Sequence, residues 1–197
     1  DTTESRGLGD VYKRQHHEAM KFVMPVRQKI AEKTIFNLLG PHTNPCSAKK
    51  QVIGVYDKKL VKMFSNVAKN LDMKHVMIVH GDDGLDEISI CSETVVSELK
   101  DNNISEYKIS PKDYGLNLSS FDQITANSSD ESLLLVNSAF NGESSAVQDM
   151  IALNSGAALY VASVVNSISD GVEMAFDCMN NGQAAQKLAD YVRVSNE

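Results

Sequence analysis

The sequence predicts an α/β fold in which a mixed, partly parallel sheet is flanked by helices. Four consecutive apolar residues, Val76–Val79, are typical of a strand that is buried on both faces. A strand pattern and a helix pattern precede this run, so the three elements form a βαβ unit. From Ser129 onward the apolar spacing is that of helices. The βαβ unit makes the sheet at least partly parallel.

The βαβ unit is expected to begin with a buried strand over Gln51–Tyr56, because this segment is rich in β-branched residues. Asp57 is a suitable N-cap for the helix that follows. The apolar residues of this helix recur at helical spacing and form one stripe, which we expect to cover the sheet. They are Leu60, Met63, Phe64, Val67 and Leu71. The crossover back to Val76–Val79 should be right-handed.

An acidic loop follows the buried strand, where residues 80–89 read HGDDGLDEIS. In open α/β sheets, ligands bind in the crevice beyond the carboxyl ends of the strands. The order of the carboxylates does not fit a calcium-binding EF-hand loop. The adjacent Asp86 and Glu87 could supply half of a magnesium site that a phosphorylated substrate completes. From spacing alone, an acidic surface turn without a ligand is the alternative.

Further strands are expected after the acidic loop. Ile88–Ile90 and Thr94–Leu99 alternate apolar and polar residues around a short turn, and Tyr107–Ile109 adds a third strand. The segment from Pro111 to Leu116 predicts a turn in which Gly115 permits a positive φ.

The second half of the chain predicts helices. Leu133–Phe140 precedes a helix stop, and residues 145–168 are rich in alanine, serine and glycine, which suits close helix packing. Asp170 is expected to cap a further helix that ends at Asn181 and Gly182. The apolar residues of that helix are Val172, Ala175, Phe176 and Met179. A last helix is expected over residues 184–192.

Composition excludes several classes of partner. The chain has 197 residues and a net charge of −7, from 19 basic and 26 acidic residues, and it contains no basic run. Nucleic acid and anionic membranes are therefore disfavoured as partners. The three cysteines are far apart in the sequence, which suggests neither a disulfide framework nor a zinc site and fits a reducing cytoplasm. No apolar stretch approaches the roughly 20 residues of a membrane span.

Two stretches, residues 33–45 (KTIFNLLGPHTNP) and 80–89, closely resemble anthranilate phosphoribosyltransferase. The resemblance extends from about His16 to near the C-terminus and implies a nucleoside phosphorylase/phosphoribosyltransferase-like large domain. It implies transfer of 5-phosphoribosyl from phosphoribosyl pyrophosphate to the amino group of anthranilate, the second step of tryptophan biosynthesis. It also implies magnesium as cofactor, since Asp86 and Glu87 match the acidic pair that binds this metal in the family.

The resemblance also implies an anthranilate site. Arg27 matches an arginine that contacts anthranilate, and a guanidinium group suits a planar carboxylate because it can form two parallel hydrogen bonds. His17 matches a histidine that lines the same pocket, and Pro41 lies against the anthranilate ring. Without the resemblance, Arg27 would be a solvated arginine on a helix, His17 a surface histidine and Pro41 a helix stop.

No side chain is assigned as nucleophile or acid–base catalyst. The cysteines lack His or acidic neighbours in the sequence, so direct displacement of pyrophosphate is favoured over a covalent intermediate. In the helical half, Asn137 and Asn154 lie in stretches similar to family signatures, and we interpret them as helix-packing or hydrogen-bonding positions.

The resemblance divides the chain into two parts. Residues 1–15 match nothing in the family at this position and are interpreted as a disordered or foreign leader, whereas residues 16–197 form a partial α/β catalytic domain. The family's N-terminal helical domain and glycine-rich phosphate loop are absent from the sequence. We therefore expect the chain to be inactive by itself and the full-length enzyme to be a cytoplasmic homodimer.

Three other functions remain as alternatives. A pyrimidine nucleoside phosphorylase-like enzyme shares the expected fold, although the pairs Gly40–Pro41 and Asp86–Glu87 favour the anthranilate type. A non-catalytic relative that binds nucleic acid on the same scaffold is disfavoured by the net charge of −7. An inert truncated product is the third alternative.

Overall fold

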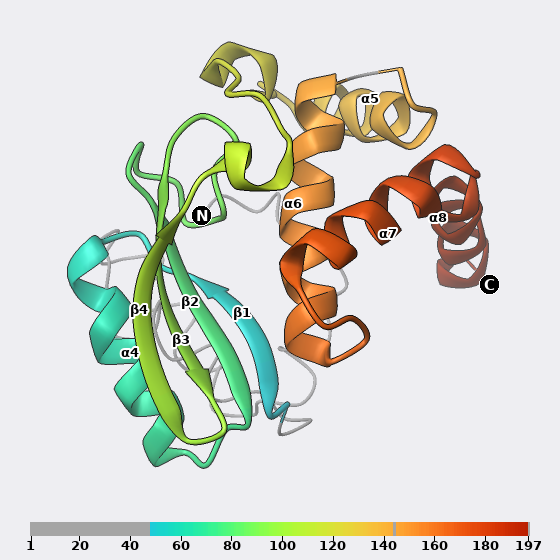
Figure 1. Ribbon diagram of the computed structural model, residues 1–197. Coiled ribbons are helices and arrows are strands. Elements are labelled where there is room, and N and C mark those ends of the chain that lie inside the picture. The colour runs from blue at the N-terminus through green and yellow to red at the C-terminus, as the bar shows by residue number, and fades with distance from the viewer. Residues whose placement is uncertain (1–47, 144, 197) are drawn as a thin grey trace, which may run out of the picture. The chain divides into compact units, whose positions relative to one another are not determined.

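This computed structural model of the protein describes residues 48–143 and 145–196. All elements below belong to the compact unit Lys49–Glu197 (Figure 1). Its strands are β1 (Lys50–Gly54), β2 (His75–Gly81), β3 (Thr94–Lys100) and β4 (Asn103–Ile109). Its helices are α4 (Lys58–Asn70), α5 (Ser129–Phe140), α6 (Ser145–Ala162), α7 (Ile168–Asn180) and α8 (Gln183–Ser195). Two short 3-10 turns, Pro111–Tyr114 and Phe121–Gln123, separate β4 from α5.

The strands form one mixed sheet in the order β1-β2-β3-β4 (Figure 1). β1 pairs with β2 in parallel, with Lys50 opposite His75 and Gly54 opposite Val79. The pairs β2–β3 and β3–β4 are antiparallel. Every residue of β2 is buried, as expected for a strand that is covered on both faces. The mixed, partly parallel sheet and its βαβ unit are therefore confirmed.

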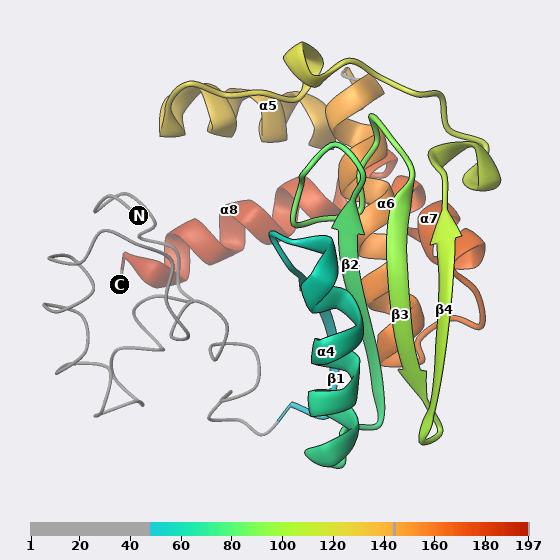
Figure 2. The same cartoon turned by 90° about the vertical axis from the view of Figure 1, so that its left-hand side faces the viewer.

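Helices cover both faces of the sheet. α4 packs on β2 and β3, whereas α6 packs on the other face against β1 and β2 (Figures 1 and 2). Because side chains alternate along a strand, Met77 and Val79 point toward α6 and join a core with Leu153 and Val172. None of the described helices is both long enough and apolar enough to cross a membrane.

The predicted buried face of α4 is partly wrong. Asp57 caps the helix as expected, since its side chain accepts a hydrogen bond from the Lys59 amide. Of the predicted stripe, Phe64 is buried, but Met63, Val67 and Leu71 are exposed. The residues that face the sheet are Val61, Phe64, Ser65 and Ala68. Ser65 belongs to this face because Ser97 of β3 donates a hydrogen bond to its hydroxyl at 2.8 Å.

The predicted strand over Ile88–Ile90 is also wrong. These residues are buried but lie outside the sheet, since β2 ends at Gly81 and β3 begins at Thr94. Their backbone is paired with side chains: the Ile88 amide donates to Asn154 and the Ser89 amide to Thr94. The other two predicted strands are present, and the last is longer than expected. Gly115 has the positive φ expected, 73°.

The helical half follows the prediction with two corrections. α6 ends at Ala162, before the predicted end at Ile168, because the chain turns at Ser163 with a φ of 62°. Ser167, and not Asp170, caps α7, since its side chain accepts from the Asp170 amide. α6 and α7 cross closely at Gly156 and Gly171: a Cβ on Gly156 would lie 2.7 Å from the Val172 nitrogen.

A buried polar cluster lies near the start of β2. His75 donates to Glu98 of β3 at 2.7 Å, and Tyr107 of β4 donates to the other carboxylate oxygen at 2.7 Å. The His75 ring also contacts the Tyr160 ring of α6, with centroids 4.9 Å apart. Burial alone would raise the pKa of Glu98, but the hydrogen bonds from Tyr107 and His75 outweigh it and hold this pKa below its ordinary value.

Candidate functional site

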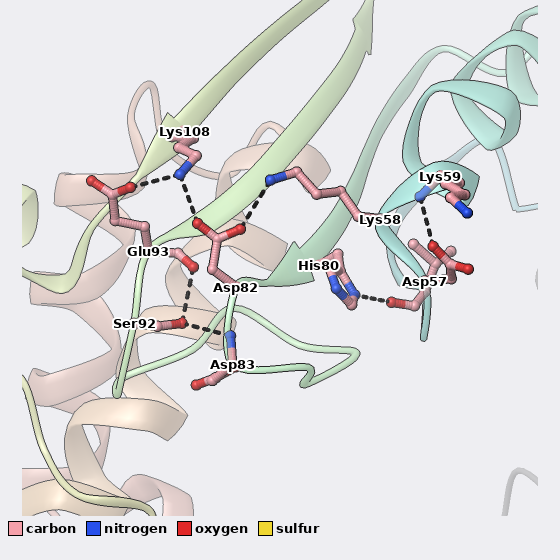
Figure 3. Close-up of polar contacts among 10 residues, drawn as sticks. Asp57, Lys58, Lys59, His80, Asp82, Asp83, Ser92, Glu93 and Lys108 are labelled. Carbon is pink, nitrogen blue, oxygen red and sulfur yellow. Dashed lines mark hydrogen bonds and ion pairs between the residues drawn. The ribbon is translucent and has the colours of Figure 1, made fainter.

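The carboxyl ends of β1 and β2 lie side by side because the two strands are parallel, and a turn follows each. His80 of β2 fixes the turn after β1: its Nδ1 donates to the Val55 carbonyl at 2.7 Å (Figure 3). A carbonyl oxygen only accepts, so the Nδ1 atom carries the proton. The acidic loop after β2 runs from Asp82 to Glu93 and connects to β3.

Asp82 forms ion pairs with two lysines. The Nζ atoms of Lys58 and Lys108 approach its carboxylate to 3.1 and 2.6 Å, and Lys108 also contacts Glu93 at 2.8 Å (Figure 3). Hydrogen bonds from Lys108 and then Lys58 lower the pKa of Asp82. All four side chains are substantially exposed, so each pair contributes little to stability. The network braces the loop against α4 and β4.

Asp83 folds the loop internally. Its Oδ1 accepts from the Leu85 amide at 3.2 Å, and its Oδ2 accepts a short hydrogen bond from the buried Ser89 hydroxyl. The same Ser89 oxygen accepts from the Cys91 amide at 2.9 Å. Asp83 is therefore a structural residue of the loop.

Asp86 and Glu87 are the carboxylates of this loop that remain available. Both residues are exposed, and neither side chain has a hydrogen bond or ion pair with the part of the chain that the structure describes. Although Glu87 is exposed, partial burial of its carboxyl raises its pKa, and the negative charge of Asp86 raises it further. A bound cation would offset both effects.

The donor chemistry of this pair fits magnesium. Carboxylate oxygens are hard ligands, and Mg²⁺ is usually held by one or two protein carboxylates, with water and substrate phosphates completing its shell. Among the described residues, no three His, Cys, Asp or Glu side chains gather as a metal site. Asp86 and Glu87 would thus form an open, two-carboxylate site and not a closed protein cage.

Backbone contacts from two distant elements position the acid pair. The Asp86 carbonyl lies against Gly54 of β1 so closely that a Cβ at Gly54 would be 1.5 Å from its oxygen. On the other side, the Asn154 side chain of α6 accepts from the Ile88 amide at 3.0 Å and donates to the Ile88 carbonyl at 2.9 Å. Sequence reasoning proposed Asn154 as a hydrogen-bonding position, which is confirmed, but it missed Gly54.

The other predicted site residues are not placed by the structure. Arg27, His17 and Pro41 lie outside the described residues, as does the predicted boundary near residue 16. Asn137 is exposed on α5, and its side chain has no hydrogen bond to the described part of the chain. Asp86 and Glu87 are thus neighbours whose carboxylates have no partner within residues 48–143 and 145–196, and the anthranilate contacts stay predictions.

The fold and the site define an α/β protein with an open acidic site at the carboxyl ends of its parallel strands. A model of the glycosyl transferase family, a/b domain, matches residues 2–185. The chain belongs to this family. The match includes the predicted leader from residue 2 onward.

Curated relatives carry one name. The chain is 45% identical over 192 residues to an anthranilate phosphoribosyltransferase of Vesicomyosocius okutanii, and 47% identical over 194 residues to one of Ruthia magnifica. Each alignment covers 98% of this chain but 57% of the relative. The chain thus spans somewhat more than half the length of these relatives.

Solved structures of the same name share the fold. Anthranilate phosphoribosyltransferase from Thermus thermophilus superposes with a TM-score of 0.82 at 31% identity, over 92% of this chain and 54% of that one. The Saccharomyces cerevisiae enzyme, solved in complex with PRPP and Mg, superposes with a TM-score of 0.80 over 92% of this chain and 53% of that one. At 22% identity, this second likeness is evidence for the fold alone.

Proposed function

We propose that the full-length protein containing this chain transfers 5-phosphoribosyl from phosphoribosyl pyrophosphate to the amino group of anthranilate. The observation that carries the proposal is that Asp86 and Glu87, at the carboxyl ends of β1 and β2, have no side-chain partner among the described residues. The relatives named anthranilate phosphoribosyltransferase support it. The yeast enzyme, which shares the fold, has been solved in complex with PRPP and Mg. This reaction is the second step of tryptophan biosynthesis.

In this proposal Asp86 and Glu87 would hold Mg²⁺. When bound, the metal supplies positive charge that stabilises the leaving pyrophosphate. Two protein carboxylates would leave the other positions of the ion to phosphate and water. With a net charge of −7, the chain needs such local positive charge to bind an anionic substrate.

Arg27, His17 and Pro41 would bind anthranilate. The Arg27 guanidinium would grip the carboxylate, His17 would line the pocket, and Pro41 would lie against the ring. Their role would be to place the anthranilate amine in line with the anomeric carbon, so that displacement needs no protein nucleophile. A yeast anthranilate phosphoribosyltransferase has been solved with 4-fluoroanthranilate, which supports a site for this class of ligand in such proteins.

The proposal extends to compartment and assembly. We propose a cytoplasmic enzyme that acts as a homodimer in its full-length form, without nucleic-acid or membrane partners. Within the described residues Cys91 and Cys178 form no disulfide, which supports a reducing compartment. A pyrimidine nucleoside phosphorylase-like activity is the second candidate, because it is compatible with the same fold.

Loss of anthranilate fluorescence on addition of phosphoribosyl pyrophosphate measures the proposed activity in the full-length protein. The double variant Asp86→Ala/Glu87→Ala should lose activity together with its dependence on Mg²⁺. A matched control, Glu173→Ala/Asp177→Ala, removes two exposed carboxylates of α7 and should retain both. An unchanged rate in the first variant refutes the metal assignment, and phosphorolysis of a pyrimidine nucleoside without any turnover of anthranilate favours the second candidate.

A further inference from the structure

The segment that carries the acid pair has no partner strand in the part of the chain that the structure describes. β2 ends at Gly81 and β3 begins at Thr94, so the backbone of Asp86–Ile88 makes none of the ladder hydrogen bonds of the sheet. Ile88 is nevertheless buried, with 1% of its surface exposed. A buried peptide group without a partner is costly because it loses its hydrogen bonds to water, so this segment needs hydrogen bonds from elsewhere.

Asn154 supplies them from α6. Its Oδ1 accepts from the Ile88 amide at 3.0 Å, while its Nδ2 donates to the Ile88 carbonyl at 2.9 Å and to the Met150 carbonyl at 3.1 Å. Only a side-chain amide carries both an acceptor and two donors in this arrangement. The bond to Met150 of the same helix fixes the orientation of the amide, so Ile88 is held against a rigid element.

We propose that Asn154 is a positioning residue for the metal pair, acting through Ile88 on the adjacent Glu87 and on Asp86. Neither carboxylate has a partner in the described part of the chain, so their positions depend on the backbone that carries them. That backbone is fixed at Ile88 by Asn154 and limited at Asp86 by Gly54. The inference rests on the proposed magnesium role of Asp86 and Glu87.

The expected size of the effect follows from outer-shell contacts at other metal sites. Residues that orient metal ligands without touching the metal typically change metal affinity by about 10–100-fold when they are replaced. Replacement of Asn154 by Leu keeps the approximate size and introduces no charge, but it removes every hydrogen bond to Ile88. We expect a loss of divalent-cation affinity in this range.

The experiment is a titration of the 197-residue chain with Mn²⁺ in the presence of inorganic pyrophosphate, followed by electron paramagnetic resonance. Asn66→Leu is the matched control, because the Asn66 Nδ2 also donates to the carbonyl four residues earlier, Lys62, at 2.8 Å but lies exposed on α4. Asn154→Leu should weaken Mn²⁺ binding about 10–100-fold, and Asn66→Leu should not. Asn154→Gln keeps the amide oxygen and the NH₂ group and should retain more Mn²⁺ affinity than Asn154→Leu.

Two further arms separate the possible failures. If Asp86→Ala/Glu87→Ala binds Mn²⁺ like the wild type, the magnesium assignment is wrong. If that variant loses binding while a folded Asn154→Leu keeps it, the positioning role is wrong and the proposed function stands. Circular dichroism establishes that each variant is folded before it is titrated.

A measurement on the wild type decides the question if Asn154→Leu does not fold. If the metal binds only when the segment around Ile88 is held by Asn154, then metal binding must suppress local opening of that segment. Mg²⁺ and pyrophosphate at ten times the dissociation constant should therefore slow hydrogen exchange of the Ile88 amide roughly tenfold. An Ile88 exchange rate that does not respond to saturating metal overturns the inference.

Discussion

Gly54 of β1 and Asp86 of the acidic loop are in direct backbone contact: a Cβ at Gly54 would lie 1.5 Å from the Asp86 carbonyl oxygen. No side chain fits at that distance, so any residue other than glycine must displace the loop or the end of β1. The contact links the turn after β1 to the acid pair.

Gly54→Ala should therefore affect stability and metal binding together. We expect the free energy of unfolding to fall by roughly 1–3 kcal/mol, as for other overpacked sites, because backbone atoms must move. Metal affinity should also fall, because the displaced carbonyl belongs to Asp86 itself. Urea unfolding and a Mn²⁺ titration measure the two effects. Gly182→Ala is the control: its φ of 79° makes alanine strained, but a Cβ there meets nothing within 4 Å. It should lower stability alone.

The second prediction concerns the crossing of α6 and α7. Alanine in place of Gly156 favours a helix by about 1 kcal/mol, but its Cβ would lie 2.7 Å from the Val172 nitrogen. Because that atom is backbone, we expect the clash to outweigh the helix propensity and to lower the free energy of unfolding by about 1–2 kcal/mol. Gly171→Ala should act in the same direction. Ser155→Ala is the control. If Gly156→Ala unfolds at a urea midpoint equal to or above that of Ser155→Ala, the close crossing of α6 and α7 is contradicted.

The third prediction concerns acid stability. Since the pKa of Glu98 is lowered in the folded protein from its ordinary value of 4.5, the ionised carboxylate stabilises the fold above that value. This stabilisation should be lost as the pH falls through the lowered pKa. Glu98→Gln should cost about 2 kcal/mol at neutral pH, because the hydrogen bonds from His75 and Tyr107 lose their charged acceptor. Urea unfolding at a series of pH values measures the stability of the wild type and of Glu98→Gln. The difference in stability between the two proteins should shrink in acid.

Glu106→Gln is the matched control for Glu98. Glu106 lies on β4 and pairs with Lys62 at 2.9 Å, but its side chain is 49% exposed. An exposed pair contributes at most about 1 kcal/mol, so its loss should change stability little at any pH. Equal effects of the two variants would mean that burial of the His75–Glu98–Tyr107 cluster is energetically unimportant.

The fourth prediction separates the carboxylates within one loop. Asp82 is paired with Lys58 and Lys108, whereas Asp86 has no partner in the described residues. Asp82→Asn should therefore lower stability only slightly and leave Mn²⁺ affinity nearly unchanged. Asp86→Asn should leave stability nearly unchanged and weaken Mn²⁺ binding. A loss of metal affinity in Asp82→Asn equal to that in Asp86→Asn would show that the loop binds cations through its total charge.

The sequence predicted the fold well where burial and backbone pairing coincide. The apolar run of β2 and the strand before it indicated the parallel pair correctly. Ile88–Ile90 was wrongly predicted as a strand because both isoleucines are buried. The amides of Ile88 and Ser89 donate to the side chains of Asn154 and Thr94 and not to a neighbouring strand. Apolar alternation reports burial and does not report the hydrogen-bond partner, which in one case lies 66 residues away.

The candidate site was predicted in part for a similar reason. Asp86 and Glu87 are identifiable from their charge and from their place after a buried strand. Gly54 carries no side chain, and Asn154 acts on the backbone of Ile88, so neither contact leaves a pattern in the sequence. A glycine at the end of β1 and an asparagine within an apolar helix were the available signals. Each indicates a special position without naming its partner.

The metal assignment is tested most directly by a crystal structure of the protein with Mn²⁺ and phosphoribosyl pyrophosphate, with the metal located by its anomalous scattering. We expect one Mn²⁺ within about 2.5 Å of a carboxylate oxygen of both Asp86 and Glu87, with pyrophosphate oxygens completing its shell. A fully occupied Mn²⁺ bound to the pyrophosphate but held by other residues, with Asp86 and Glu87 in contact with solvent alone, would contradict the assignment.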